Sequence, residues 1–90
     1  MIVKIDRSFE KDTNKIKDKK LLKQLADCIE AISFLQDFSE IRNLKKMKGA
    51  SNHYRIRLGV YRLGVIINKN TIIFERCLHR KDIYKYFPSI

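Results

Sequence analysis

The first part of the chain has a pattern of apolar and polar positions that predicts a strand followed by a helix. Residues 2–6 are expected to form a short strand, with Val3 and Ile5 on one face. Ser8 is a suitable N-cap for a helix of about two turns, because Phe9 and Ile16 then lie on one side of it. We therefore expect the protein to begin with a β-strand and a short helix.

A longer helix is predicted from Lys19 to Gln36, with Asp18 as its N-cap. Its apolar residues recur every three to four positions, which is typical of the buried face of a helix. They are Leu21, Leu22, Leu25, Cys28, Ile29, Ile32 and Leu35. Charged residues occupy the opposite face, so we assign the apolar stripe to the protein core.

Beyond residue 53 the apolar period falls from about 3.6 residues to 2, which indicates strands. Three strands are expected, at residues 54–58, 61–67 and 71–78, and their short connections predict an antiparallel meander. Gly59-Val60 suits a type II′ turn, which takes glycine at its first central position. Asn68-Lys69-Asn70 supplies the second turn.

The segments on either side of the meander have weaker patterns. Residues 37–53 are polar and are expected to form a loop, with a short strand near Leu44 to Met47. Residues 81–87 predict one or two helical turns that end at Pro88. The whole pattern is β-α-α-β-β-β-α, a single α+β domain of residues 1–90 in which a helical hairpin covers one face of an antiparallel meander.

The first turn of the meander determines which arginines lie opposite each other. Arg57 is expected opposite Arg62, and Arg55 opposite Gly64, which would leave a shallow floor on that face. Like charges in opposite positions destabilise a sheet, whereas two guanidinium groups match the oxygens of a bound phosphate. We therefore expect an anion site here; the alternative is that the arginines are solvated and pair with Glu75.

The second turn extends this face to the last strand. It predicts that Arg62 lies opposite Cys77 and that Gly64 lies opposite Glu75. His79 follows the same alternation and is expected beside the arginines. The other face is apolar and is expected to pack against the helices; it contains Tyr54, Ile56, Leu58, Leu63, Val65, Ile67, Ile72 and Phe74.

The net charge of +10 is concentrated in one part of the chain. Residues 41–74 contain eight Lys or Arg residues and no Asp or Glu. A stretch of one sign indicates an anionic partner such as nucleic acid, an acidic protein or a membrane surface; the alternative is a charge that only keeps the protein soluble. No apolar run approaches the ~20 residues of a membrane span, and charges begin too early for a signal peptide, so we expect a cytoplasmic protein.

The residue types that usually hold metals or nucleotide cofactors are sparse. Cys28 and Cys77 form no C-x-x-C pair, and His53 and His79 do not have the spacing of a zinc site. The three glycines are scattered, so no glycine-rich phosphate loop is present. We expect no metal or cofactor, and two reduced, partly buried cysteines, although the sequence leaves a disulfide open.

Proton transfer beside the arginines needs another side chain, because the pKa of arginine stays above about 12. His79 has an ordinary pKa suited to transfer near pH 7; the alternative is a packing or helix-start role. Tyr84 is placed to stack on a base or to help in proton transfer. Lys45, Lys46 and Lys48 are expected to steer a nucleic-acid backbone.

Three segments resemble motifs of the RelE/ParE toxin superfamily. Residues 54–62, Tyr-Arg-Ile-Arg-Leu-Gly-Val-Tyr-Arg, resemble its Y-R-I-R-x-G-x-Y-R core. Residues 78–84, Leu-His-Arg-Lys-Asp-Ile-Tyr, resemble its closing H-R-x-D-I/V-Y motif. Residues 44–49 resemble the L-x-x-L-x-G approach to the core. With the opening strand and the helical hairpin, the resemblance covers nearly the whole chain.

The resemblance implies a small toxin of a type II toxin–antitoxin system. RelE-like members are ribosome-dependent endoribonucleases that cut mRNA without a metal, by attack of a ribose 2′-OH on the adjacent phosphate. The residues that match the catalytic positions are Arg55, Arg57, Arg62, His79 and Tyr84, and the expected RNA-binding residues are Lys45, Lys46, Lys48 and Arg80. Some ribonuclease members carry lysine at the first two positions, and lysine loses a proton far more readily than arginine, so we expect His79 to be the general base.

Partners and alternatives follow from the same resemblance. It implies a cognate antitoxin with an acidic, amphipathic segment that covers the basic face or the helices, and mRNA and the ribosome as targets. The toxin alone is expected to be a monomer and the complex a hetero-oligomer, with no membrane partner. The alternative function is that of the ParE branch, inhibition of DNA gyrase without catalytic residues, or that of a degenerate toxin that only binds its antitoxin.

Overall fold

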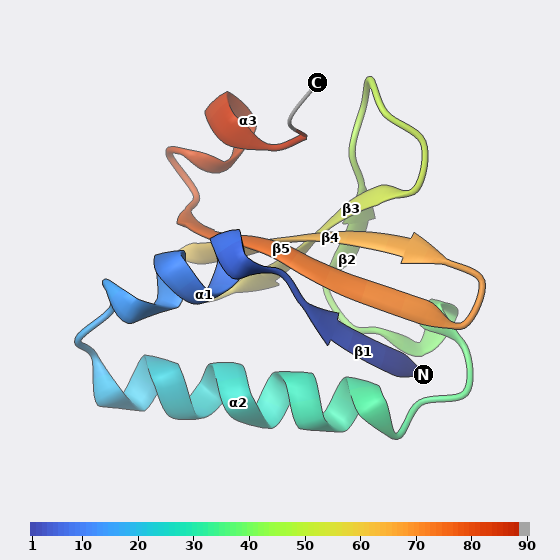
Figure 1. Cartoon of the computed structure of the whole chain (residues 1–90), viewed down its shortest axis with the longest axis horizontal. Helices are drawn as coiled ribbons and strands as arrows, with labels where there is room; N and C mark the ends of the chain where they lie inside the picture. Colours follow the sequence, from blue (N-terminus) through green and yellow to red (C-terminus); the bar gives the residue numbers. More distant parts are fainter. Residues whose placement is uncertain (89–90) are drawn as a thin grey trace.

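The chain folds around a five-stranded mixed sheet (Figure 1). The computed structural model describes residues 1–88. The elements are β1 (Ile2–Ile5), α1 (Arg7–Asn14), α2 (Lys19–Ser33), a 3-10 turn η1 (Phe38–Glu40), β2 (Leu44–Lys46), β3 (His53–Leu58), β4 (Tyr61–Asn68), β5 (Thr71–His79) and α3 (Ile83–Tyr86). The strand order is β1-β5-β4-β3-β2. The predicted α+β class and element order are confirmed, with β2 as the fifth strand.

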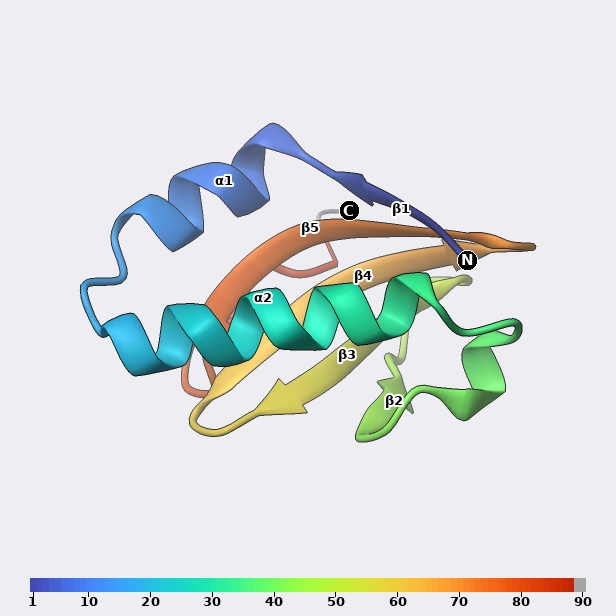
Figure 2. The ribbon, with the colours of Figure 1, turned by 90° about the horizontal axis from the view of Figure 1, so that it is seen from below.

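The strands are antiparallel to their neighbours except for β1, which runs parallel to β5. The long connection from β1 through α1 and α2 makes this possible, because a parallel neighbour cannot be reached by a tight turn. The two helices lie along one face of the sheet, as Figure 2 shows from below. The short helix α3 lies on the opposite side of the sheet (Figure 1).

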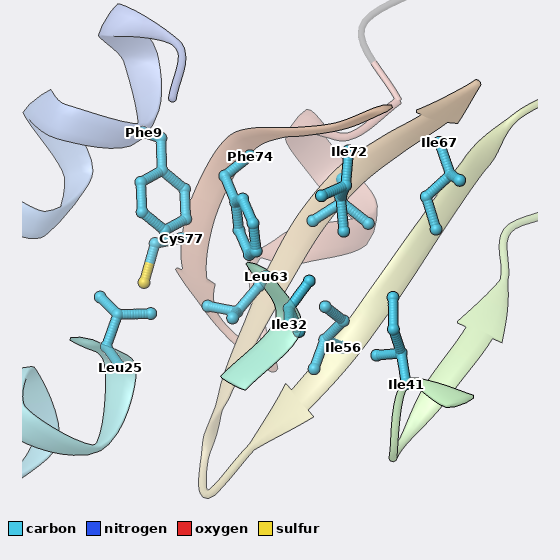
Figure 3. Close-up of a cluster of buried hydrophobic side chains, with 11 residues drawn as sticks. Phe9, Leu25, Ile32, Ile41, Ile56, Leu63, Ile67, Ile72, Phe74 and Cys77 are labelled. Atoms are coloured by element: carbon cyan, nitrogen blue, oxygen red, sulfur yellow. The ribbon is translucent and has the colours of Figure 1, made fainter. Parts of the chain in front are cut away.

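The main core lies between the sheet and the first two helices (Figure 3). Phe9 of α1 meets Phe74 of β5 edge to face, with ring centres 5.4 Å apart. Leu25 and Ile32 of α2 fill the same layer. Burial of one such side chain stabilises a fold by about 1.5–3 kcal/mol. The face of the meander that was predicted to be apolar is the face that packs here, with Leu63 and Val65 fully buried.

The first helix begins differently from the prediction. Asp6 is its N-cap, and the side chain of Asp6 accepts a hydrogen bond from the backbone N–H of Ser8. Ser8 lies inside the first turn, so the prediction of Ser8 as the cap is wrong. A carboxylate is also favoured at this end by the helix dipole. Hydrogen bonds from the Ser8 hydroxyl and backbone N–H lower the pKa of Asp6.

The second helix has the predicted cap and ends earlier than predicted. The side chain of Asp18 accepts hydrogen bonds from two backbone N–H groups of the first turn. The helix ends at Ser33 rather than Gln36. The N-terminal ammonium of Met1 donates to the carbonyl oxygens of Ser33 and Leu35 at 3.2 and 2.7 Å. These long-range bonds satisfy carbonyls that a helix end leaves unpaired, and the local sequence does not reveal them.

The first hairpin of the meander has the predicted partners. Arg57 pairs with Arg62, and Arg55 pairs with Gly64. Gly59, the first residue of the two-residue loop, has a φ of +59°, the left-handed value that a type II′ turn requires there. A turn of fixed length sets the partners of the whole hairpin, so this part of the fold follows from a short stretch of sequence.

The second hairpin departs from the prediction part of the way along. Its turn is as predicted, because Ile67 pairs with Ile72. An irregularity between Gly64 and Val65 then shifts the pairing by one residue, and Glu75 is skipped. A bulge of this kind reverses the side-chain alternation of the rest of the strand. Everything predicted about the faces of β5 beyond Phe74 is therefore affected.

Two predicted pairs are wrong for this reason. Arg62 pairs with Leu78 rather than Cys77, and Gly64 pairs with Arg76 rather than Glu75. Cys77 instead pairs with Leu63 and is buried in the main core. The last part of β5 thus presents to the helices the residues that were expected on the opposite face.

A second, smaller cluster forms on the α3 face of the sheet. Met47, Ile83 and Phe87 are buried there, with Ile66 and Leu78 packed against them. The predicted helical turns near residues 81–87 are found as Ile83–Tyr86. Within residues 1–88, no helix has the length and apolar character needed to cross a bilayer.

Candidate functional site

The open face of the sheet gathers arginines from three segments of the chain. Arg55 and Arg57 come from β3, Arg62 comes from β4, and Arg80 follows β5 directly. Arg80 is held there because its backbone N–H donates to the carbonyl of Val60, in the first hairpin turn, at 2.8 Å. We call these four residues the arginine cluster. Strand alternation places Arg55, Arg57 and Arg62 on this face, because their neighbours Ile56 and Leu63 are buried among the helices.

Electrostatics supports the closeness of the four side chains. The pKa of Arg62 is lowered, first by partial burial and then by the positive charges of Arg55, Arg57 and Arg80. Tyr84 acts on this pKa in the opposite direction. Guanidinium groups that repel one another in this way attract an anion strongly, and phosphate oxygens match their paired N–H donors.

Hydrogen bonds hold the arginines without neutralising them. The Arg55 side chain donates from Nε to the hydroxyl of Tyr84 at 3.0 Å. Arg57 donates to the side-chain oxygen of Asn43 at 3.4 Å. Arg62 donates from Nη1 to the carbonyl oxygens of Gly59 and Tyr61, both at 2.9 Å. All of these acceptors are uncharged, so the positive charge of the cluster remains available to a ligand.

Tyr84 is brought to this cluster by the short helix α3. Tyr84 is 66% exposed, whereas Ile83 of the same helix and Phe87, the residue after the helix, are buried. Tyr84 therefore lies beside the arginines, as predicted. It depends on the packing of α3 on the sheet and not on strand pairing.

A pocket of about 270 Å³ lies beside Tyr84. It is lined by Lys45, Lys46, Met47, Lys48, Tyr84, Phe87 and Pro88. Lys45 lies directly opposite Arg55 in the pairing of β2 with β3, so the pocket adjoins the arginine cluster. The ammonium group of Lys46 lies 5.6 Å from the ring centre of Tyr54, a residue of the helix face, which separates it from the other two lysines.

The shallow floor predicted at Gly64 is absent. The ring of Phe87 lies against Gly64 so closely that an added Cβ would come within 2.8 Å of two ring carbons. Gly64 therefore makes room for an aromatic side chain of the protein itself and not for a ligand. Phe87 itself is only 1% exposed.

His79 does not lie with the arginines, so its predicted place is wrong. The bulge in β5 gives His79 the alternation of buried Cys77. It pairs with Tyr61, and the two rings meet edge to face with centres 6.0 Å apart. The Nδ1 atom of His79 accepts a hydrogen bond from the backbone N–H of Lys81, before α3 begins at Ile83. The contact with Tyr61 is the packing role named as an alternative. The expected place of Cys77 beside the arginines is wrong for the same reason, and the skipped Glu75 lies opposite neither Gly64 nor an arginine.

Sequence reasoning missed a buried acidic residue. Asp12 of α1 is 8% exposed and accepts two hydrogen bonds from Arg76, at 2.8 and 3.2 Å, and one from the backbone N–H of Cys77 at 2.9 Å. The Arg76 guanidinium also lies 5.7 Å from the ring centre of Tyr86 on α3. One signal in the sequence points to Asp12, because its spacing places it on the same helix stripe as Phe9 and Ile16.

The cysteines have no sign of chemistry. Both are free thiols, and Cys77 is buried. Burial, together with the negative charge of Asp12, raises the pKa of Cys77 to about 12. Burial also raises the pKa of Cys28. A thiol that stays protonated is a poor nucleophile. Within residues 1–88, no group of three His, Cys, Asp or Glu side chains has a geometry suited to a metal ion.

Comparison with known proteins gives a consistent picture. The sequence profile of the family "ParE toxin of type II toxin-antitoxin system, parDE" matches residues 3–84. Toxin RelE3 of Methanocaldococcus jannaschii is 61% identical over 46 residues, which are 51% of this chain and 52% of that protein. The aligned part thus spans about half the length of this relative.

Solved structures extend the likeness to the whole fold. A chain in the crystal structure of the RelB-RelE antitoxin-toxin complex from Methanococcus jannaschii is 39% identical, with a TM-score of 0.79, and the match covers 94% of this chain and 99% of that one. A chain of the archaeal RelE-RelB complex from Pyrococcus horikoshii is 22% identical, with a TM-score of 0.70 over 88% and 93% of the two chains, and shares the fold. The chain belongs to the ParE toxin family of type II toxin–antitoxin systems, within the RelE/ParE superfamily.

Proposed function

We propose that this protein is the toxin of a type II toxin–antitoxin system and that it cleaves mRNA on the ribosome as an endoribonuclease. The single observation that carries the proposal is the arginine cluster with Tyr84 at its edge. Four cations and an exposed aromatic ring on one face match the phosphates and the bases of a single strand.

The proposed reaction is an internal transfer at phosphorus. The 2′-oxygen of a ribose attacks the adjacent phosphate, the bond from phosphorus to the 5′-oxygen breaks, and a 2′,3′-cyclic phosphate and a 5′-hydroxyl remain. One proton leaves the 2′-hydroxyl and one reaches the departing oxygen. Negative charge builds on the phosphate oxygens in the transition state, and donors placed to receive it lower the barrier.

The arginines supply the positive charge that this reaction needs. Arg55, Arg57 and Arg62 hold the scissile phosphate, and the facing pair Arg57 and Arg62 is the natural place for its oxygens. Tyr84 stacks on a base or helps to move a proton, since its hydroxyl already contacts Arg55. Arg80, Lys45 and Lys48 bind the flanking RNA backbone. The proposal uses no metal ion or cofactor.

A cognate antitoxin is part of the proposal. The related chains were solved in RelB-RelE complexes, which supports a partner of that kind for this protein. An acidic segment of the antitoxin has a matching surface in the arginine cluster, and binding there would exclude RNA. The proposed place of action is the cytoplasm, where ribosomes translate mRNA.

Toe-print mapping on translating ribosomes tests the cleavage. Induction of the chain without an antitoxin should produce new mRNA ends and stop translation. The ends should disappear in Arg62→Ala and persist in Arg7→Ala, a matched removal of an exposed arginine from α1. Equal cleavage by the two variants would contradict the proposed site.

The ParE name of the matching family favours one rival, inhibition of DNA gyrase. The same induction experiment separates the two functions if plasmid supercoiling is measured in parallel. Loss of supercoiling with intact mRNA would replace the ribonuclease by the gyrase inhibitor. Growth without either effect would mean a degenerate toxin.

A further inference from the structure

One edge of β5 is open beyond the end of β1. The strand β1 pairs only with residues 71–74 of β5, and no other strand in the described part of the chain pairs with this edge. Side chains of α1 take the place of the missing strand. The Ser8 hydroxyl donates to the carbonyl of Glu75 at 2.6 Å. Asp12 accepts from the backbone N–H of Cys77 at 2.9 Å. These bonds satisfy backbone groups that an open edge would leave exposed.

Arg76 links this edge to the other face of the sheet. It pairs with Gly64, against which Phe87 packs, so its side chain begins on the α3 face. The guanidinium then reaches Asp12 of α1, to which it donates two hydrogen bonds at 2.8 and 3.2 Å. It also lies 5.7 Å from the ring centre of Tyr86 of α3, within the range of a cation–π contact. One side chain therefore joins a helix on one face of the sheet to a helix on the other.

The ion pair keeps Arg76 in this place. Asp12 is 8% exposed, and its two oxygens match two N–H donors of the guanidinium. The hydrogen bond to Asp12 raises the pKa of Arg76. A cavity of about 440 Å³ is lined by Asp12 and Lys15 at the end of α1, by Tyr86 of α3 and by Arg76 itself. Arg76 thus bridges a gap that the two helices do not fill by packing.

Two tyrosines of α3 are each held by an arginine. Tyr84 accepts a hydrogen bond from Arg55 at 3.0 Å, and Tyr86 lies against Arg76. Residues two apart along a helix do not face each other, so the two contacts restrain α3 in different directions. A helix of four residues is not stable by itself, so loss of one contact changes the geometry of the other.

We propose that Asp12 and Arg76 are positioning residues that set the orientation of α3, and with it the place of the Tyr84 hydroxyl against Arg55. Arg76 acts by its contact with Tyr86, and Asp12 acts through Arg76. Neither residue belongs to the arginine cluster. The inference rests on the proposed function for its effect on cleavage, whereas the orientation of Tyr84 is measured without it.

Single-turnover cleavage, with the chain in excess over programmed ribosomes, tests the effect on the reaction. Arg76→Met removes the charge and keeps an unbranched side chain. Its maximal rate should fall roughly 10- to 100-fold, because a small displacement of a group in the site costs up to about 10²-fold. Asp12→Asn keeps an acceptor for the N–H of Cys77 and should also lower the maximal rate. A natural maximal rate in either variant would overturn the proposal.

The concentration of protein that gives half of the maximal rate separates positioning from stability. It should stay unchanged in both variants, because the arginine cluster and the lysines of the pocket beside Tyr84 are intact. A loss of folded protein alone has the opposite signature, since it raises this concentration and leaves the maximal rate as it was. That signature would overturn the proposal.

A double-substitution cycle shows whether the effect passes through Tyr84. In Tyr84→Ala, which lacks the side chain to be positioned, Arg76→Met should change the maximal rate by less than about twofold. An undiminished loss in the Tyr84→Ala background would overturn the proposal, because Arg76 would then act by another route.

Matched variants accompany the cycle. Arg76→Lys keeps a cation for Asp12 and for the ring of Tyr86, and should keep most of the rate. Lys23→Met breaks the exposed ion pair with Asp27 on α2, at 3.4 Å, and should leave the rate unchanged. Tyr86→Leu removes the ring and leaves the ion pair, so it should reproduce the loss. It keeps the test valid if the unpaired Asp12 unfolds Arg76→Met.

NMR of the tyrosine ring carbons measures the orientation without ribosomes. The signals of Tyr84 are assigned by their loss in Tyr84→Phe. They should shift in Arg76→Met and in Tyr86→Leu, and should keep their natural positions in Lys23→Met. Shifted signals in a chain that leaves mRNA intact would remove the ribonuclease and keep the positioning pair. Unshifted signals would overturn the pair, whatever the chain does to mRNA.

Discussion

The role of a single side chain in this protein depends on the face of the sheet on which it lies. Arg57 and Arg62 face each other across a pair of strands at a cost in stability, which is reasonable where an anion is to be bound. His79, in contrast, lies with Tyr61 and accepts a hydrogen bond from the backbone of Lys81. The chemistry of an imidazole alone therefore says little about its function. Its place relative to the arginines decides it.

We expect His79→Ala to keep most of the cleavage activity. The imidazole lies on the opposite face of the sheet from Arg57 and Arg62, so its removal should cost much less than the 10²- to 10⁴-fold loss that follows when a positioned general acid or base is removed. The measurement is the single-turnover rate on programmed ribosomes. Arg57→Ala is the comparison, because it removes a proposed phosphate ligand from the same sheet.

A loss in His79→Ala as large as that in Arg57→Ala would return His79 to the catalytic group. The unfolding curve of His79→Ala in urea must be compared at the same time. A large fall in stability would explain reduced activity through the lost contact with Tyr61. Normal stability with a rate loss above about 10²-fold would mean that the imidazole takes part in proton transfer.

At the scale of elements, α3 is a small helix with a large effect on the site. It has only four residues, too few to be stable by itself, so packing must determine its position. Phe87 and Ile83 bury it against the sheet, and the Arg76 guanidinium lies 5.7 Å from the ring centre of Tyr86. Arg76 is in turn held by Asp12 of α1. The exposed Tyr84 is thus positioned by contacts that extend to both faces of the sheet.

Gly64→Ala should loosen this helix. Its new Cβ would meet two ring carbons of Phe87 at 2.8 Å, and overpacking of a buried contact typically costs about 1–3 kcal/mol. Urea unfolding measures the loss of stability. The hydrogen bond between Arg55 and Tyr84 should weaken as well, which the NMR signals of the Tyr84 ring would report.

A second substitution checks the cause of the effect. Leucine is smaller than phenylalanine, so Gly64→Ala should cost less stability in a Phe87→Leu background than in the natural chain. The same cost in both backgrounds would mean that Phe87 is not the obstacle. The quantity compared is the change in unfolding free energy caused by Gly64→Ala in each background. The effect of Phe87→Leu alone cancels in this comparison.

At the scale of the whole molecule, the positive charge is concentrated in one part of the sheet. The acid-free stretch of residues 41–74 contains β2, β3 and β4, which form one side of the sheet. All ten acidic residues lie outside it. The helices α1 and α2 cover the apolar face of the sheet. The arginine cluster and the pocket beside Tyr84 lie on the other face. This separation makes one surface suitable for a polyanion.

Binding to single-stranded RNA should therefore depend strongly on salt. Each phosphate contact contributes about 0.7 to the slope of log K against log salt concentration. Arg57→Gln should reduce the slope by about that amount. Lys20→Gln, an equal loss of charge on the exposed side of α2, should leave the slope unchanged. Equal effects of the two changes would indicate that only net charge matters and not the arginine face.

Much of the molecule was determined by local sequence. The stripe of α2, its Asp18 cap and the two tight turns each depend on a few neighbouring residues, and they led to the right helix, the right meander and the facing pair Arg57 and Arg62. Because the side-chain period of a strand is two, the apolar face also followed, as far along as Phe74.

Only the tertiary structure decided the rest. The shift at Gly64 and Val65 reversed the faces of the last part of β5, which moved Cys77 and His79 away from the arginines. A bulge is stabilised by what packs around it, and here the partners are Phe87 over Gly64 and Asp12 on the backbone of Cys77. Both lie far from the bulge in sequence, so no local pattern contains them. The arginines of the site followed from the sequence, whereas the side chains beside them depended on packing.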